Sequence, residues 1–181
     1  GMSNKRFITG VHKLYIFLLI IFHVPIYYLN KFSHFSSPLD YFHFLWRALL
    51  LLMVFRHNKI VRVSNGYKLH LYLPAWPSRA FFYAIESKLL RKPPGPTTVV
   101  FSMTKACSYH CQHCYQKLDH GKDLEETLMI DVANQMVEAG VAMMDIEGGE
   151  PLLRFGRLSV LLNSIDDRCE LWVNTTGAGL K

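Results

Sequence analysis

The sequence predicts an α/β fold for the C-terminal half of the chain, preceded by an apolar helical region and a β-hairpin. From residue 98 onward, short β-branched and aromatic runs alternate with longer segments whose apolar residues recur at helical spacing. Such alternation is typical of a parallel sheet with helical crossovers. Before it, two long apolar runs and a proline-rich linker at residues 92–96 set the first half apart. The domains we predict are therefore 1–59, 60–96 and 97–181.

The charge is divided in the same way. Up to Thr97 the chain has 13 basic and 2 acidic residues, whereas the remainder has 7 basic and 12 acidic residues, within a total of +6. The basic residues of the first half are scattered among apolar runs instead of forming a stripe. This pattern favours a membrane surface as the partner and argues against nucleic acid.

The apolar runs cover residues 14–29 and 41–55, and each is shorter than the roughly 20 residues of an untilted membrane-spanning helix. Lys and Arg flank both runs, and aromatic residues that suit an interface lie within them, namely Tyr27, Tyr28, Tyr41 and Trp46. We expect a membrane hairpin or an in-plane anchor. The alternative is a pair of buried helices in a soluble, partner-binding region.

The middle region, residues 60–96, predicts a hairpin followed by a helix. Alternating residues from Ile60 to Leu73 surround Asn65-Gly66, a pair typical of tight hairpin turns. Ser78 then suits the N-cap of a helix that runs to about Leu90. In residues 97–181 we expect strands at 98–103, 141–146 and 171–174, and helices at 124–139 and 152–165.

Three cysteines follow the first of these strands at a C-x3-C-x2-C spacing: Cys107, Cys111 and Cys114. A cubane iron–sulfur cluster is usually held by four cysteines, so three would leave one iron open to another ligand. Zinc is the alternative, with His110 or His113 as the fourth ligand. The remaining cysteine, Cys169, lies in an apolar run and is expected to be a buried thiol.

The second and third strands also end in residues suited to ligand binding. Gly148 and Gly149 would let a backbone approach a ligand closely, and Glu150 could accept a hydrogen bond from an ammonium group. Thr175 and Thr176 follow the third strand. In parallel sheets, ligands bind beyond the C-terminal ends of the strands. We therefore expect these residues and the cysteine loop at one edge of the sheet.

The two motifs together resemble those of the radical S-adenosylmethionine (radical SAM) superfamily. The resemblance covers roughly residues 97–181 and is carried by Cys107-Ser108-Tyr109-His110-Cys111-Gln112-His113-Cys114-Tyr115 and by Gly148-Gly149-Glu150-Pro151-Leu152. It implies that the three cysteines ligate a [4Fe–4S] cluster whose open iron binds S-adenosylmethionine, with Gly148, Gly149 and Glu150 beside its amino group. Tyr115 and Thr175 complete the expected cofactor-binding set, although Tyr115 could equally be a packing residue.

The resemblance further implies a 5′-deoxyadenosyl radical that abstracts hydrogen from a substrate the sequence does not reveal. The family's partial barrel has six strand–helix units, and this chain has room for about three, so we expect an incomplete partial barrel. The alternative function is an incompetent, truncated iron–sulfur or zinc-binding module on a membrane, and whether the chain alone is an enzyme stays open. The expected partners are membrane lipid, an electron donor such as a flavodoxin or ferredoxin, and a chain that supplies the missing half-barrel. The expected location is the cytoplasmic face of the membrane.

Overall fold

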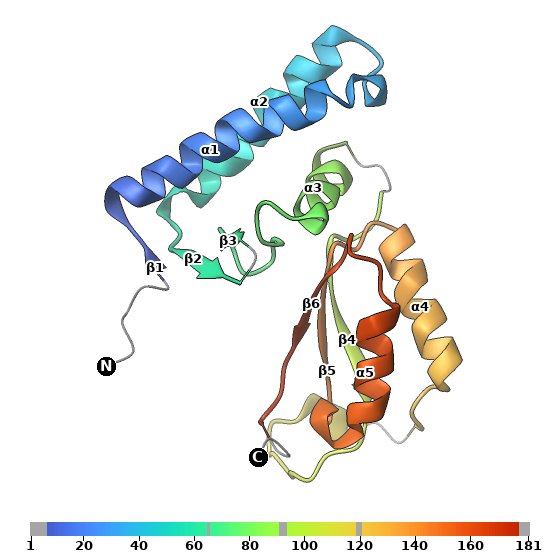
Figure 1. The fold of residues 1–181 in the computed structure, drawn as a ribbon. Coiled ribbons are helices and arrows are strands. Elements are labelled where there is room, and N and C mark those ends of the chain that lie inside the picture. The colour runs from blue at the N-terminus through green and yellow to red at the C-terminus, as the bar shows by residue number, and fades with distance from the viewer. Residues whose placement is uncertain (1–6, 65, 91–93, 119–120, 178–181) are drawn as a thin grey trace.

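The computed structural model describes residues 7–64, 66–90, 94–118 and 121–177. Three parts follow one another along the chain: a long helical hairpin, a small mixed segment, and a parallel sheet with its two helices (Figure 1). The mixed segment lies between the other two.

The helical hairpin consists of α1 (Gly10–Leu29) and α2 (Pro38–Val54), which lie side by side. Ser37 caps α2 by accepting a hydrogen bond from the Asp40 backbone N–H at 3.2 Å. The buried residues of α1 recur every fourth position and form one stripe: Ile16, Ile20, Val24 and Tyr28. Both predicted helices are confirmed. The first is longer than its apolar run, because it begins at Gly10, and a short 3₁₀ turn (Phe55–His57) extends the second.

The mixed segment begins with a small antiparallel sheet. Its strands are β1 (Phe7–Ile8), β2 (Ile60–Val63) and β3 (Gly66–Lys68), in the order β1-β2-β3. The hairpin is confirmed, but the expected strand up to Leu73 is wrong, because β3 ends at Lys68.

The reason is a second pairing partner for β3. Tyr67 exchanges both backbone hydrogen bonds with Trp76, so the chain between them turns back instead of continuing the strand. A Cβ on Gly66 would lie 2.2 Å from the Trp76 carbonyl oxygen, so this glycine permits a close backbone approach. Gly66 belongs to the strand, whereas Asn65 lies outside the described residues.

The mixed segment continues with α3 (Arg79–Ile85), which passes into a π-helical turn (Glu86–Leu90). Ser78 caps it as expected, accepting from the Phe81 N–H at 3.0 Å. Every residue from 80 to 85 is buried, because α3 packs against both neighbouring parts. The Tyr28 hydroxyl of α1 donates to the Phe82 carbonyl at 3.0 Å, and the Tyr83 hydroxyl donates to the Val137 carbonyl of the sheet unit at 2.6 Å.

The sheet unit contains β4 (Thr98–Thr104), β5 (Met143–Gly148) and β6 (Glu170–Val173), all parallel and in the order β4-β5-β6. The connections carry α4 (Glu126–Glu138) and α5 (Phe155–Ser164), the latter after a 3₁₀ turn (Pro151–Arg154). Both helices cover the same face of the sheet (Figure 1). The predicted α/β alternation is thus confirmed, with element ends that differ by up to three residues.

The two faces of this sheet differ. Apolar side chains such as Phe101, Met144 and Ile146 pack under the helices in the core. The alternate residues point to the other face and are polar or partly exposed; they are Val100, Ser102, Asp145, Glu147 and Trp172. The sheet therefore has an apolar, covered face and an open face with hydrogen-bonding groups.

The mixed segment closes the end of the sheet at which the strands begin. Lys68 is only 5% exposed, and its ammonium lies 2.5 Å from the Glu170 carboxylate at the start of β6 and 4.7 Å from the centre of the Trp172 ring. Burial lowers the pKa of Lys68, although Glu170 opposes that shift. The backbone N–H of Ala75 also donates to Glu170, at 2.5 Å. This end of the sheet is a packed interface that contains a buried ion pair.

Candidate metal centre

The three cysteines lie at the opposite end of the sheet, in the loop that follows β4. Cys107, Cys111 and Cys114 are exposed free thiols. The base of the loop is fixed by Asp123, which accepts hydrogen bonds from the Thr104 hydroxyl at 2.7 Å and the Lys105 N–H at 2.8 Å. Although burial alone would raise the pKa of Asp123, these hydrogen bonds hold it below its usual range.

Within the loop, one backbone N–H contacts a cysteine sulfur and a second closes a turn between two of the cysteines. The Tyr109 N–H donates to the Cys107 sulfur at 3.4 Å, and the Cys114 N–H donates to the Cys111 carbonyl at 3.3 Å. Among the described residues, no group of three or more His, Cys, Asp or Glu side chains converges closely enough to hold a metal ion. The described part of the loop therefore has no preformed metal site, and this holds for zinc and for a cluster alike. Three exposed thiols in one loop still provide the soft donor set that iron–sulfur clusters use.

The glycine turn after β5 packs directly on the base of the cysteine loop. The Gly149 N–H donates to the Thr104 carbonyl and the Glu150 N–H to the Ala106 carbonyl, both at 2.7 Å. A Cβ on Gly149 would lie 2.2 Å from the Ala106 oxygen, and Gly148 has a φ of +139°. Both glycines are therefore required by backbone geometry, and the two motifs lie in contact at one end of the sheet.

Glu150 is fully buried and links the ends of β5 and β6. Its carboxylate accepts hydrogen bonds from the Leu152 N–H at 3.0 Å, the Thr176 N–H at 2.8 Å, and the hydroxyls of Thr175 and Thr176. Burial would raise the pKa of Glu150, but these donors outweigh it and lower the pKa to about 2. In this structure the Glu150 carboxylate holds the third strand end against the glycine turn.

Tyr115 and Gln116 extend from the cysteine loop over the open face of the sheet. Tyr115 begins a 3₁₀ turn (Tyr115–Leu118), and its hydroxyl donates to Glu147, while the Gln116 amide donates to the hydroxyl of Ser102. Local desolvation and the Glu147 carboxylate raise the pKa of Tyr115 to about 12, so its hydroxyl stays protonated at neutral pH. Within the part of the chain that is described, the Gln116 side-chain oxygen is buried without a hydrogen-bond partner.

The predicted residues thus gather at one end of the sheet, as their strand-end positions indicate. The sequence analysis missed Gln116 and Ser102. Ser102 could have been found from its outward position in the alternation of β4, whereas the position of Gln116 depends on a 3₁₀ turn that has no clear sequence pattern. The two glycines and the three exposed thiols suit a site that binds a cluster.

Comparison with known protein families supports an iron–sulfur protein. Residues 94–181 match the family model described as a 4Fe-4S single cluster domain. This matched region includes the whole parallel sheet unit and the cysteine loop. No solved structure gives a significant match.

Individual relatives indicate which class of iron–sulfur protein the chain is similar to. The chain is 33% identical over 82 residues to the 7-carboxy-7-deazaguanine synthase of Clostridium acetobutylicum, covering 44% of this chain and 37% of that protein. It is 34% identical over 91 residues to the GTP 3′,8-cyclase of Staphylococcus haemolyticus, covering 44% and 27%. A probable GTP 3′,8-cyclase of Archaeoglobus fulgidus is 30% identical over 69 residues, covering 37% and 23%. The chain therefore spans well under half the length of these curated relatives.

Both kinds of relative are radical SAM enzymes. The matched 4Fe-4S domain and these relatives together support the resemblance of residues 94–181 to the radical SAM superfamily. Relatives of this kind with a 4Fe-4S domain imply a [4Fe–4S] cluster and S-adenosylmethionine as the cofactors.

Proposed function

We propose that Cys107, Cys111 and Cys114 hold the [4Fe–4S] cluster and that the protein is a radical SAM enzyme, or part of one. When bound, the cluster supplies the electron that cleaves S-adenosylmethionine to methionine and a 5′-deoxyadenosyl radical, which abstracts hydrogen from the substrate. The observation that carries this proposal is the direct contact between the cysteine loop and the turn at Gly148 and Gly149.

The roles of the individual residues follow from that contact. Gly148 and Gly149 present backbone groups beside the loop, which suits them to orient the amino group of S-adenosylmethionine. Glu150 acts behind them, because its buried carboxylate fixes Thr175 and Thr176 next to the turn. Tyr115 and Gln116 form one wall, held by hydrogen bonds from the Tyr115 hydroxyl to Glu147 and from the Gln116 amide to the Ser102 hydroxyl.

The open face of the sheet suits the interior of a partial barrel. Both helices lie on one side of the sheet, which leaves the other side without a helical layer (Figure 1). That side carries Ser102, Asp145 and Glu147, which could contact a substrate. Among the described residues, the outer edge of β6 pairs with no strand, so further strands could extend the sheet there. We propose that these come from a continuation of the chain or from a second chain.

Anaerobic reconstitution with iron and sulfide tests the proposal. We expect a broad absorbance at about 400 nm. After addition of S-adenosylmethionine and a reductant, we expect 5′-deoxyadenosine to form. A cluster that yields no deoxyadenosine would favour the incompetent module. One equivalent of bound zinc without any cluster would favour the zinc site. The exposed cysteine loop suits a protein donor such as flavodoxin or ferredoxin, and either should replace the chemical reductant.

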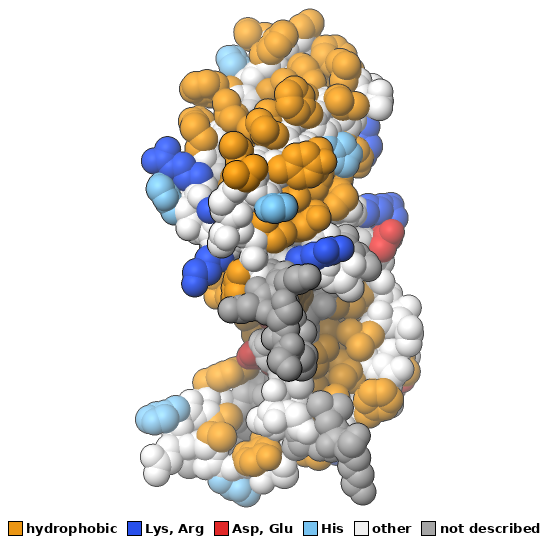
Figure 2. Space-filling model, turned by 60° about the vertical axis from the view of Figure 1, so that its left-hand side comes forward, with side chains coloured by type: hydrophobic (Ala, Val, Ile, Leu, Met, Phe, Trp, Pro, Cys, Tyr) orange, Lys and Arg blue, Asp and Glu red, His pale blue; other side chains and the backbone are white. Residues whose placement is uncertain are grey.

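We further propose that the helical hairpin associates with membrane lipid. Two helical stretches, Gly10–Leu29 and Pro38–His57, are long and apolar enough to cross a membrane by length and composition. Only 17% and 11% of their most apolar 18-residue stretches are buried, whereas the core helices of a soluble protein are mostly buried. Figure 2 shows hydrophobic side chains over the upper part of the molecule, with Lys and Arg side chains along the lower border. Free thiols and a cluster suit a reducing compartment, which supports the cytoplasmic face.

The arrangement also bears on the substrate. The mixed segment packs at the end where the strands begin and the hairpin lies beyond it, whereas the cysteine loop follows β4 at the opposite end of the sheet. A site that faces away from the hairpin would receive its substrate from the aqueous side. Fractionation tests the membrane association, because a chain that is wholly soluble at low salt without detergent would contradict it.

A further inference from the structure

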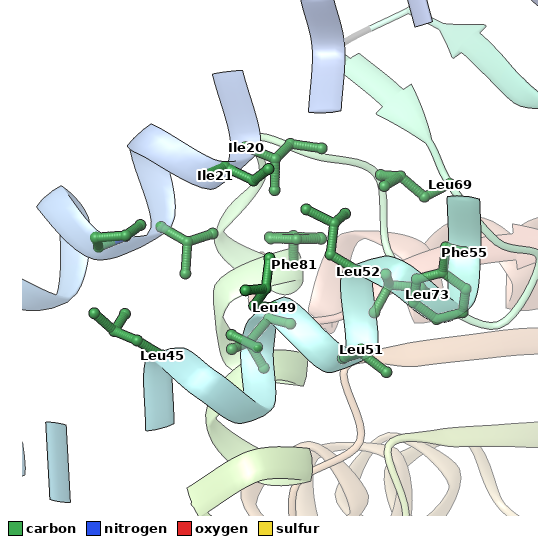
Figure 3. Close-up of a pocket in the computed structure, with 14 residues that line it drawn as sticks. Ile20, Ile21, Leu45, Leu49, Leu51, Leu52, Phe55, Leu69, Leu73 and Phe81 are labelled. Carbon is green, nitrogen blue, oxygen red and sulfur yellow. The ribbon is translucent and has the colours of Figure 1, made fainter. Parts of the chain in front are cut away.

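An apolar pocket lies between the two long helices and the mixed segment, away from the candidate metal centre. It has a volume of about 190 Å³. Figure 3 shows that its walls come from α1 and α2, and that Leu69, Leu73 and Phe81 of the mixed segment point into the same space. Every residue that lines the pocket is hydrophobic. Such a lining offers water no hydrogen-bond partner, so the pocket suits an apolar group.

The pocket opens onto the uncovered surface of the hairpin. Ile21 of α1 and Leu49 of α2 line the pocket and are also 38% and 36% exposed. Around this opening, the same helices expose further large apolar side chains, such as Phe22 and Trp46. The pocket is therefore continuous with the surface that we assign to the membrane.

The charged side chains on and near the hairpin indicate which kind of surface the opening of the pocket faces. Exposed cations lie on and just after the hairpin, at Arg47, Arg56, Lys59 and Arg62. Of the two acidic residues before Thr97, Glu86 is paired with Lys31 at 3.5 Å, which leaves Asp40 as the acidic residue of the hairpin itself. This distribution complements anionic headgroups, because basic residues near such a surface are attracted to it.

We propose that the pocket binds one hydrocarbon chain of a bilayer phospholipid, which enters between α1 and α2 while its headgroup stays at the cationic border. This inference rests on the proposed membrane association. The bound chain would contact Leu69, which directly follows Lys68 in the sequence, and Leu73, five residues after Lys68. Lipid binding would thus stabilise the segment whose lysine closes the sheet.

Photolabelling tests the proposal with the full chain on vesicles of phosphatidylcholine and phosphatidylglycerol. The probe is a phosphatidylcholine with a diazirine in one acyl chain. We expect label on Leu73 and Phe81, which form the floor of the pocket and are 4% and 3% exposed. A vesicle-bound chain labelled only on outer residues such as Phe42 and Trp46 would overturn the proposal.

Matched variants separate the pocket from the outer surface. Ala48 lines the pocket, so Ala48→Phe should reduce labelling of the floor about tenfold while vesicle binding persists. Val54 lies on the same helix, is 70% exposed and does not line the pocket, so Val54→Phe should change neither. Because the wild-type labelling pattern is decisive by itself, the test does not depend on the folding of Ala48→Phe.

The remaining outcomes distinguish this inference from the proposals on which it depends. Equal labelling of the floor by a free diazirine fatty acid without vesicles would indicate a soluble ligand and overturn the bilayer source. Failure of the chain to bind vesicles would overturn both this inference and the membrane association. Neither result would affect the proposed radical SAM chemistry, which cluster reconstitution tests independently.

Discussion

The two ends of the parallel sheet are built in opposite ways. Where the strands begin, the buried Lys68–Glu170 pair and the apolar α3 leave a closed interface. Where the strands end, backbone contacts at Gly149 and the carboxylate of Glu150 hold three loops together, yet the thiols of the cysteines stay exposed. One end is completed by the protein itself, while the other is arranged so that a ligand completes it. The predictions below test this difference, beginning with the largest expected effect.

Loss of any one cysteine of the loop should prevent assembly of the cluster at the end of the sheet where the strands end. We expect Cys107→Ala, Cys111→Ala and Cys114→Ala to lose the absorbance at about 400 nm after reconstitution. The loop has three cysteines, and the cluster needs all three of them as ligands. Iron content per chain measures the result. The buried Cys169 offers the control, since Cys169→Ala should keep its cluster. Normal iron in a loop variant would contradict the ligand assignment.

Gly149→Ala should disrupt the contact between the two motifs. Its Cβ would lie 2.2 Å from a backbone oxygen of Ala106, so the turn must move away, and we expect a loss of about 3 kcal/mol in unfolding free energy. Anaerobic urea unfolding in detergent provides the measurement, with cluster yield as a second readout. Gly156→Ala is the matched control. A Cβ added at Gly156 would meet nothing within 4 Å, and this residue lies in the first turn of α5. Equal stability of both variants would mean that the motifs are not packed as described.

At the closed end, Lys68→Met should cost about 3 kcal/mol, since it leaves the Glu170 carboxylate without its cation. Denaturant unfolding checks the value, and the double variant with Glu170→Gln should recover part of the loss through coupling. The exposed pair of Arg79 and Asp167 provides a contrast, because Arg79→Ala should cost less than about 1 kcal/mol. A cost for Lys68→Met as small as that for Arg79→Ala would show that this end is not closed.

The smallest expected effect is a loss of folding stability at acidic pH. The pKa of Glu150 is lowered to about 2 in the folded chain, so the unfolded chain binds its proton more readily. Its contribution to stability is therefore present above the unfolded pKa, about 4.3, and is lost as the pH falls toward 2. Unfolding of the cluster-free chain between pH 7 and 3 should show this decline. Glu150→Gln should show a shallower pH dependence, and an unchanged slope would contradict the role of the carboxylate.

Much of this architecture could be predicted from the sequence. The alternation after residue 97 predicted the order and the parallel pairing of three strands, and it placed both motifs at one end. Ser78 marked the start of α3 correctly. These features are local, because they depend on side-chain periodicity and on hydrogen bonds between near neighbours.

What could not be predicted depends on contacts between distant segments. The early end of β3 follows from the pairing of Tyr67 with Trp76, and the burial of Lys68 depends on Glu170, about 100 residues away. The ammonium-acceptor role expected for Glu150 did not anticipate that Thr175 and Thr176 would occupy its carboxylate. The membrane association, the partners and the roles of Tyr115 and Thr175 toward a cofactor stay predictions.

The closed end has a practical consequence for expressing a soluble form. A fragment cut at the proline-rich linker would retain Glu170 and Met143 but lose the lysine that covers both. A boundary just after residue 57 would instead remove the two long helices and keep Lys68 with α3. It would, however, uncover Phe81 and Phe82, so polar replacements on that side of α3 would have to accompany the truncation.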